Sequence, residues 1–141
     1  MKKLILLILS FNLILYTVAC STMKPYDLEG TDSIEIHAYG NESAEPVAEF
    51  VVKGEDAERI VEMFSSLKLK EMNYTEPSIR GYEFWFRDKN GDQIAKLELP
   101  FGHSPWVVVG GSVYQDVNSG IDTEYLAQLV DIASTSGPMV K

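Results

Sequence analysis

Residues 82–99 read YEFWFRDKNGDQIAKLEL, and this stretch decides the fold. In both halves the residues alternate between two faces, a period typical of β-strands. One face carries Tyr82, Phe84, Phe86, Ala95, Leu97 and Leu99. Between the halves lies Asn90-Gly91, the strongest short signal for a two-residue type I′ hairpin turn. The stretch therefore predicts two antiparallel strands that bury one face.

The burial pattern also predicts how these strands pair. A two-residue loop at Asn90-Gly91 sets Phe84 opposite Leu97 and, on the other face, Trp85 opposite Lys96. A three-residue loop would set Phe84 against Lys96 instead. Because a slip of one residue moves a whole apolar set to the wrong face, we expect the two-residue register.

Before this hairpin, the sequence predicts another hairpin and a helix. Residues 34–38 and 47–52 are short strands separated by a turn-rich segment. The helix follows Gly54 and has acidic residues in its first turn, which suits the N-terminal end of a helix dipole. Its buried side chains recur at helical spacing: Ala57, Ile60, Val61, Phe64 and Leu67.

After the central hairpin, the sequence predicts a third hairpin and a closing helix. Residues 106–109 and 112–117 flank Gly110-Gly111, but the pattern does not say which face of this hairpin is buried. Asp122 is a good N-cap for the last helix, which ends before Gly137. The element order predicts an α+β fold: an antiparallel β-sheet of hairpins with two helices packed on one face.

The N-terminus has the pattern of an export signal. Lys2 and Lys3 precede an apolar run over residues 4–15, which is too short to span a bilayer comfortably. Small residues then lead to Cys20, the only cysteine. The sequence Thr17-Val18-Ala19-Cys20 resembles the lipobox of bacterial lipoproteins. This resemblance implies cleavage before Cys20, a diacylglyceryl group on its sulfur, and a position on the outer face of the cell membrane.

The chain divides into four predicted segments. Residues 1–19 form the signal peptide, and residues 20–33 form the lipidated N-terminus and a flexible polar tether. Residues 34–136 form a single domain, and residues 137–141 form a tail. The domain is similar to small uncharacterised lipoprotein domains of Gram-positive bacteria, through its order of elements and the turn at residues 88–92. That resemblance implies the layout of the fold and carries no activity.

The charge of the chain narrows its partners. The full chain has 12 basic and 21 acidic residues, and loss of residues 1–19 removes Lys2, Lys3 and no acid. The mature chain thus has 10 basic and 21 acidic residues, a net charge of −11. Because such a chain repels phosphate backbones, we expect no nucleic-acid partner.

Three features resemble chemical sites, and none matches its motif. The turn with Asp88 and Asp92 lacks the glycine position and following helix of a calcium loop. The two histidines, His37 and His103, have no nearby set of zinc ligands. His103-Ser104 lacks a nucleophile-elbow motif. The sequence therefore predicts no catalytic residue, metal site or cofactor.

Trp85 is the candidate binding residue. It lies on the strand face opposite the aromatic set, between two charged neighbours, where it could anchor a partner. A cation–π pair with Lys96, or cover by the tether or a loop, would instead make its role structural.

Together these features predict a function class. We expect a membrane-anchored extracytoplasmic lipoprotein, held by lipid on Cys20, that acts as a non-catalytic module for binding an envelope protein or a cell-wall ligand. The alternative is a small cell-envelope enzyme that acts on cell-wall material.

Overall fold

Three pairs of strands that follow one another in the chain build most of the sheet. The computed structural model describes residues 24–40, 43–73, 80–100 and 106–135. The antiparallel pairs are β1 (Ser33–Tyr39) with β2 (Pro46–Lys53), β4 (Arg80–Arg87) with β5 (Gln93–Pro100), and β6 (Trp106–Val109) with β7 (Ser112–Asp116). All three hairpins were predicted from the sequence.

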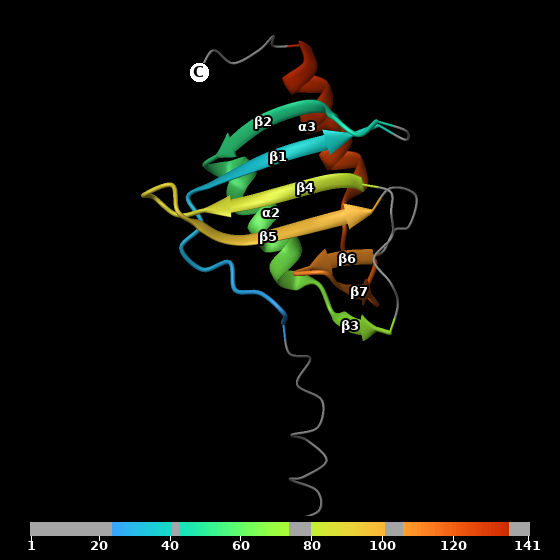
Figure 1. Cartoon of the computed structure of the whole chain (residues 1–141). Helices are drawn as coiled ribbons and strands as arrows, with labels where there is room; N and C mark the ends of the chain where they lie inside the picture. Colours follow the sequence, from blue (N-terminus) through green and yellow to red (C-terminus); the bar gives the residue numbers. More distant parts are fainter. Residues whose placement is uncertain (1–23, 41–42, 74–79, 101–105, 136–141) are drawn as a thin grey trace, which may run out of the picture.

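The hairpins join side by side into one seven-stranded antiparallel sheet. Its order is β2-β1-β4-β5-β6-β7-β3, so β1 lies against β4 and β5 lies against β6 (Figure 1). The edge strand β3 (Leu69–Met72) pairs only with β7 and was not predicted.

Both helices lie on one face of this sheet, which confirms the α+β prediction (Figure 1). They are α2 (Glu55–Ser66) and α3 (Thr123–Thr135). The N-cap role predicted for Asp122 is confirmed, because its Oδ1 accepts a hydrogen bond from the backbone N–H of Tyr125 at 2.9 Å. Within the described residues, neither helix is long and apolar enough to cross a membrane.

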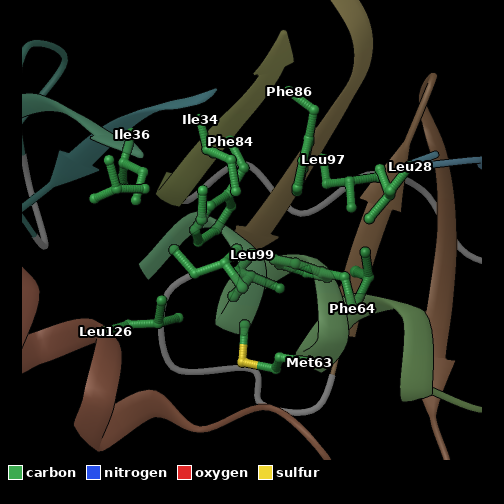
Figure 2. Packing of buried hydrophobic residues seen from close by; sticks show 14 of the residues in the cluster. Leu28, Ile34, Ile36, Met63, Phe64, Phe84, Phe86, Leu97, Leu99 and Leu126 are labelled. Atoms are coloured by element: carbon green, nitrogen blue, oxygen red, sulfur yellow. The ribbon is translucent and has the colours of Figure 1, made fainter. Parts of the chain in front are cut away.

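The core lies between the helices and the inward face of the sheet. Phe84, Phe86 and Leu97 are fully buried there, as the alternation predicted. Phe64 of α2 meets the rings of Phe84 and Phe86 edge-on, with ring centroids 5.0 Å apart for Phe84 and 5.8 Å apart for Phe86. Figure 2 shows these aromatic residues with Leu126 of α3 on the other side of the cluster.

The central hairpin has the predicted register but a different turn. Phe84 pairs with Leu97 and Trp85 with Lys96. The loop nevertheless contains three residues, because the backbone N–H of Asp88 bonds the carbonyl of Asp92 at 2.9 Å. Only Gly91 has a positive φ, of 86°, so the type I′ turn is wrong. A bulge, with Arg87 opposite Gln93, restores the register.

Both faces of the β6–β7 hairpin are buried. Val107 belongs to the core cluster beneath the helices, and Val109 and Tyr114 pack against that cluster. Val108 and Val113 pair with each other and are also buried, although they alternate with the inward residues. The sequence did not indicate which face of this hairpin is buried, and the structure shows that both are.

The predicted tether is too long. From Lys24 onward the segment packs on the domain: Leu28 is 4% exposed within the core, and the Tyr26 hydroxyl donates to the carbonyl of Phe64 at 2.8 Å. Lys24 donates to the carbonyl of Ser65. The signal peptide, Cys20 and the predicted tail at residues 137–141 lie outside the described residues.

Candidate functional site

The sheet face that the helices do not cover carries a connected set of polar side chains. We call it the open face and define it by eight residues of β1, β4 and β5: Glu35, His37, Tyr39, Glu83, Trp85, Arg87, Lys96 and Glu98. Their position follows from alternation, because their neighbours along each strand point into the core. They meet because β4 lies between β1 and β5 in the sheet.

Glu83 is the buried centre of the open face. Its side chain is only 6% exposed, yet it accepts hydrogen bonds from the Tyr39 hydroxyl at 3.0 Å and from Lys96 Nζ at 3.3 Å. His37 Nδ1 and Arg80 Nε lie 3.9 Å from its two oxygens. Burial, and then the hydrogen bond to Glu83, raise the pKa of Tyr39. Tyr39 therefore stays a hydrogen-bond donor at neutral pH.

Glu35 organises the other half of the open face. His37 Nε2 lies 2.9 Å from Oε1, and Arg87 Nη2 and Nε lie 2.7 and 3.2 Å from Oε2. Because a carboxylate only accepts, His37 Nε2 carries the hydrogen of this contact. The hydrogen bonds from His37 and then from Arg87 hold the pKa of Glu35 below its ordinary value. The carboxylate is therefore a fixed anion that locks the histidine and arginine in place.

Trp85 lies between these two polar groups. Lys96 Nζ is 4.8 Å from the centre of its ring, which confirms the cation–π pair that the register predicted. The imidazole of His37 is 6.0 Å away and tilted by 36°. The indole Nε1 is buried and has no hydrogen-bond partner in the part of the chain that the structure describes. A buried donor without an acceptor lowers the free energy of unfolding by about 1–3 kcal/mol.

Two exposed apolar residues extend the open face to the edge of the sheet. Val47 and Val51 of β2 are 64% and 43% exposed. Val51 pairs with Glu35, which in turn pairs with Trp85 on β4. The open face therefore joins an apolar edge to an interlocked set of ion pairs.

Three groups of the open face have pKa values shifted away from neutral pH. The pKa of Glu35 is lowered and that of Tyr39 is raised. For Lys96, burial lowers the pKa, but the hydrogen bond and charge of Glu98 outweigh it and raise the pKa overall. Each of these shifts moves the group away from neutral pH, whereas a general acid or base works best near the operating pH.

A second feature, on the helical side, is a recess of about 270 Å³ between α2 and the start of α3. Its polar side chains already pair with one another. Arg59 lies 3.7 Å above the ring of Tyr125 and 3.2 Å from Asp122 Oδ2. The Tyr125 hydroxyl donates to Asp56 at 2.7 Å, and burial, followed by this bond, raises its pKa to about 12.

The structure separates the residues that the sequence singled out. His37 lies beside Trp85 on the open face, whereas Cys20 and His103 lie outside the described residues. Asp88 is in the turn, where its Oδ1 accepts hydrogen bonds from the backbone N–H groups of Asn90 and Asp92. Within the described ranges, no three metal-ligating side chains form a site.

The sequence did not predict that Glu83 is the buried centre of the open face. Alternation did place it on the same face as Trp85, but nothing in the sequence indicated that Tyr39 and His37 of β1 would meet it. Those contacts depend on the pairing of β1 with β4.

Comparisons with family models, with curated proteins and with solved structures found no match to this chain.

Proposed function

We propose that the protein is a lipoprotein, anchored by lipid on Cys20 to the outer face of the cell membrane, whose open face binds another envelope protein without catalysis. The observation that carries the binding role is the open face: neither described helix covers it, Trp85 lies at its centre, and the exposed Val47 and Val51 extend it to the sheet edge. The anchor is supported by the signal pattern that ends at the lone cysteine.

A protein partner suits this chemistry better than a sugar. Stacking on a sugar needs a free aromatic face, but Lys96 and His37 lie close to the Trp85 ring. The neighbouring surface combines exposed valines with paired charges, and protein interfaces combine an apolar centre with a polar rim in the same way.

The recess beside α2 is where the alternative, a cell-wall enzyme, would place its chemistry. Its phenol has a pKa near 12, and its arginine is held by Asp122 and the Tyr125 ring. These groups are poor general acids or bases at neutral pH. The observations therefore favour binding.

The anchor is tested first by mass spectrometry of the membrane fraction. We expect the mature chain to begin at Cys20 with the added mass of the lipid. A Cys20→Ala variant should appear in the medium or remain uncleaved. Unmodified Cys20 in the wild-type protein would exclude the anchor.

The binding face is tested by crosslinking in intact cells, followed by purification of the lipidated protein. Val51→Glu adds a charge at the edge of the open face, and Trp85→Ala removes the indole ring at its centre. Ala127→Glu is the matched control, because it adds the same charge at an exposed position on α3. We expect the first two variants to lose the crosslinked partner and the control to keep it. If all three keep it, the open face is not the binding site.

A further inference from the structure

If the anchor is as proposed above, the lipid on Cys20 lies a short distance from the domain. Lys24 is the first described residue, four positions after Cys20. Four residues span at most about 14 Å when fully extended. Most of the predicted tether therefore packs on the domain and does not act as a spacer. The domain must lie close to the headgroups.

Contacts of the N-terminal segment show which end of the domain lies nearest the lipid. Lys24 and Tyr26 bond the carbonyls of Ser65 and Phe64, in the last turn of α2. The chain passes from this turn directly into β3, and the backbone N–H of Val117 donates to the carbonyl of Lys68 at 2.9 Å. In Figure 1, the start of the blue segment lies at the same end of the domain as β3. The anchor thus emerges beside the edge strand β3.

The end of the domain near β3 carries a cluster of exposed lysines. Lys24, Lys68 and Lys70 are exposed, and Val117 is 57% exposed; we call these four residues the anchor-side surface. No ion pair with a carboxylate is recorded for its three lysines within the described residues. The cations of the open face and of α2, by contrast, have acidic partners: Arg59, Arg80, Arg87 and Lys96.

Lys53 and Lys89 also have no carboxylate partner among the described residues, but they lie on the opposite edge strand β2 and in the β4–β5 turn. The acidic residue of β3, Glu71, alternates with Lys70 and so points to the other face of that strand. Exposed lysines beside an exposed aliphatic residue suit a bilayer surface, where the amines meet lipid phosphates and the apolar group enters the interface.

We propose that the anchor-side surface rests on the membrane, with Lys24, Lys68 and Lys70 against the phosphate groups of the lipids. The strand order then sets the height of every strand. At about 4.8 Å per strand, β4 with Trp85 stands about 19 Å above β3, and β2 stands about 29 Å above it. The carboxylates of the open face, on β1, β4 and β5, then lie beyond the Debye length of about 8 Å at physiological ionic strength, so the membrane repels them weakly.

The test uses the full-length lipidated protein in vesicles of equal parts phosphatidylglycerol and phosphatidylcholine that contain a headgroup-linked quencher. Because lipid occupies Cys20, a single introduced cysteine is the only thiol available for a fluorescent label. Glu71→Cys on β3 and Glu49→Cys on β2 are matched, since both replace an exposed glutamate on an edge strand. We expect quenching to be several-fold stronger at position 71 than at position 49. Equal quenching would overturn the orientation.

The role of the lysines is tested in the same vesicles with the label at position 71. Lys68→Gln with Lys70→Gln should weaken the quenching several-fold, whereas Lys53→Gln with Lys89→Gln should not, although both pairs remove the same charge. Unchanged quenching in the first pair would overturn the contact with lipid phosphates.

The mass of Cys20, measured on the same preparation, separates the two proposals. Lipid-bearing protein with equal quenching at positions 71 and 49 contradicts the orientation alone. A missing lipid mass contradicts the anchor, and the orientation fails with it.

Discussion

At the scale of single residues, Trp85 and Phe84 are sequence neighbours with opposite environments. Phe84 is fully buried against Phe64, whereas Trp85 is half-buried under Lys96 with an unpaired Nε1. The two positions therefore separate a residue that holds the core from one that lies on the open face.

We predict that Phe84→Ala lowers the free energy of unfolding by about 3–5 kcal/mol, the range for a buried aromatic residue. Trp85→Phe should change it by less than about 1 kcal/mol, because the lost ring area is offset by removal of a buried donor without a partner. Urea denaturation of both variants measures the difference. A loss at Trp85→Phe as large as that at Phe84→Ala would show that the indole is a core residue.

Glu83 and Glu98 are two carboxylates on one row of the open face with different burial. Glu83 accepts from both Tyr39 and Lys96, whereas the bond recorded for Glu98 is that from Lys96. We predict that Glu83→Ala costs about 2–3 kcal/mol, since it leaves the buried Tyr39 hydroxyl without its acceptor. Glu98→Ala should cost less than about 1 kcal/mol, as for a more exposed pair. Equal losses in urea denaturation would contradict the central role of Glu83.

Glu35 links the open face to pH. His37 and Arg87 lower its pKa in the folded protein below the ordinary value of 4.5. A lowered folded-state pKa means that the carboxylate stabilises the fold fully above 4.5, and that this contribution is lost as the pH falls through the folded value.

We therefore predict that the free energy of unfolding of the wild type falls more between about pH 6 and pH 3 than that of Glu35→Gln. Urea denaturation at both pH values gives the comparison, with Glu49→Gln as a control on the same face. Parallel losses in wild type and Glu35→Gln would show that Glu35 contributes nothing to the acid sensitivity.

At the scale of elements, the central hairpin shows what the sequence could and could not predict. The aromatic alternation was enough to predict the pairing of Phe84 with Leu97, because any other register exposes the apolar set. It could not predict the turn, because a bulge lets a three-residue loop serve the same register. Asn90-Gly91 therefore predicted a hairpin correctly and its geometry wrongly.

The turn yields a direct test. Gly91 has a φ of 86°, whereas Asn90 is not among the residues with positive φ. We predict that Gly91→Ala costs about 1–2 kcal/mol, the strain of a side chain in the left-handed region. Asn90→Ala should cost less than about 0.5 kcal/mol, as for an exposed residue without special backbone geometry. In a type I′ turn both positions would be sensitive, so thermal or urea unfolding of the two variants distinguishes the geometries.

Short or isolated elements could not be predicted from the sequence, for a physical reason. β3 has four residues, and Leu69 is its one fully buried side chain, so no periodicity identifies it. Leu28 is similarly a single apolar residue in a polar segment, and only the finished core shows that it is buried. The same limit applies to the open face: its residues were placed on one side of their strands, but the contacts between β1 and β4 required the sheet order.

The docked N-terminal segment stabilises the end of α2. The Tyr26 hydroxyl donates to the carbonyl of Phe64 in the last turn of α2, which also accepts a hydrogen bond from the C-cap N–H of Leu67 at 3.3 Å. We predict that Tyr26→Phe lowers the free energy of unfolding by about 1 kcal/mol, the usual contribution of one hydrogen bond. Amide hydrogen exchange should speed up in residues 24–32 and in the last turn of α2. Unchanged exchange there would indicate that the segment is held by Leu28 alone.

At the scale of the whole molecule, the two proposals use different parts of one sheet. The anchor-side surface lies at the β3 edge, while Trp85 lies four strands away on β4. If β3 rests on the membrane, the strands run parallel to the bilayer. The sheet then stands upright, and the open face is perpendicular to the membrane surface. A partner would then approach in the plane of the membrane, as a neighbouring anchored protein does.

The position of β3 also determines when the fold can be completed. Leu69 pairs with Asp116, 47 positions later in the chain, whereas the strands of each hairpin meet as soon as both have been made. Closing so long a loop is slow compared with forming a hairpin, and the end of α2 lacks its sheet support until it happens. A nascent chain therefore stays incompletely folded until its last third has been synthesised. If the chain is exported as proposed, through a narrow channel that admits only extended chain, this late closure keeps it competent for translocation and delays folding until it has crossed the membrane.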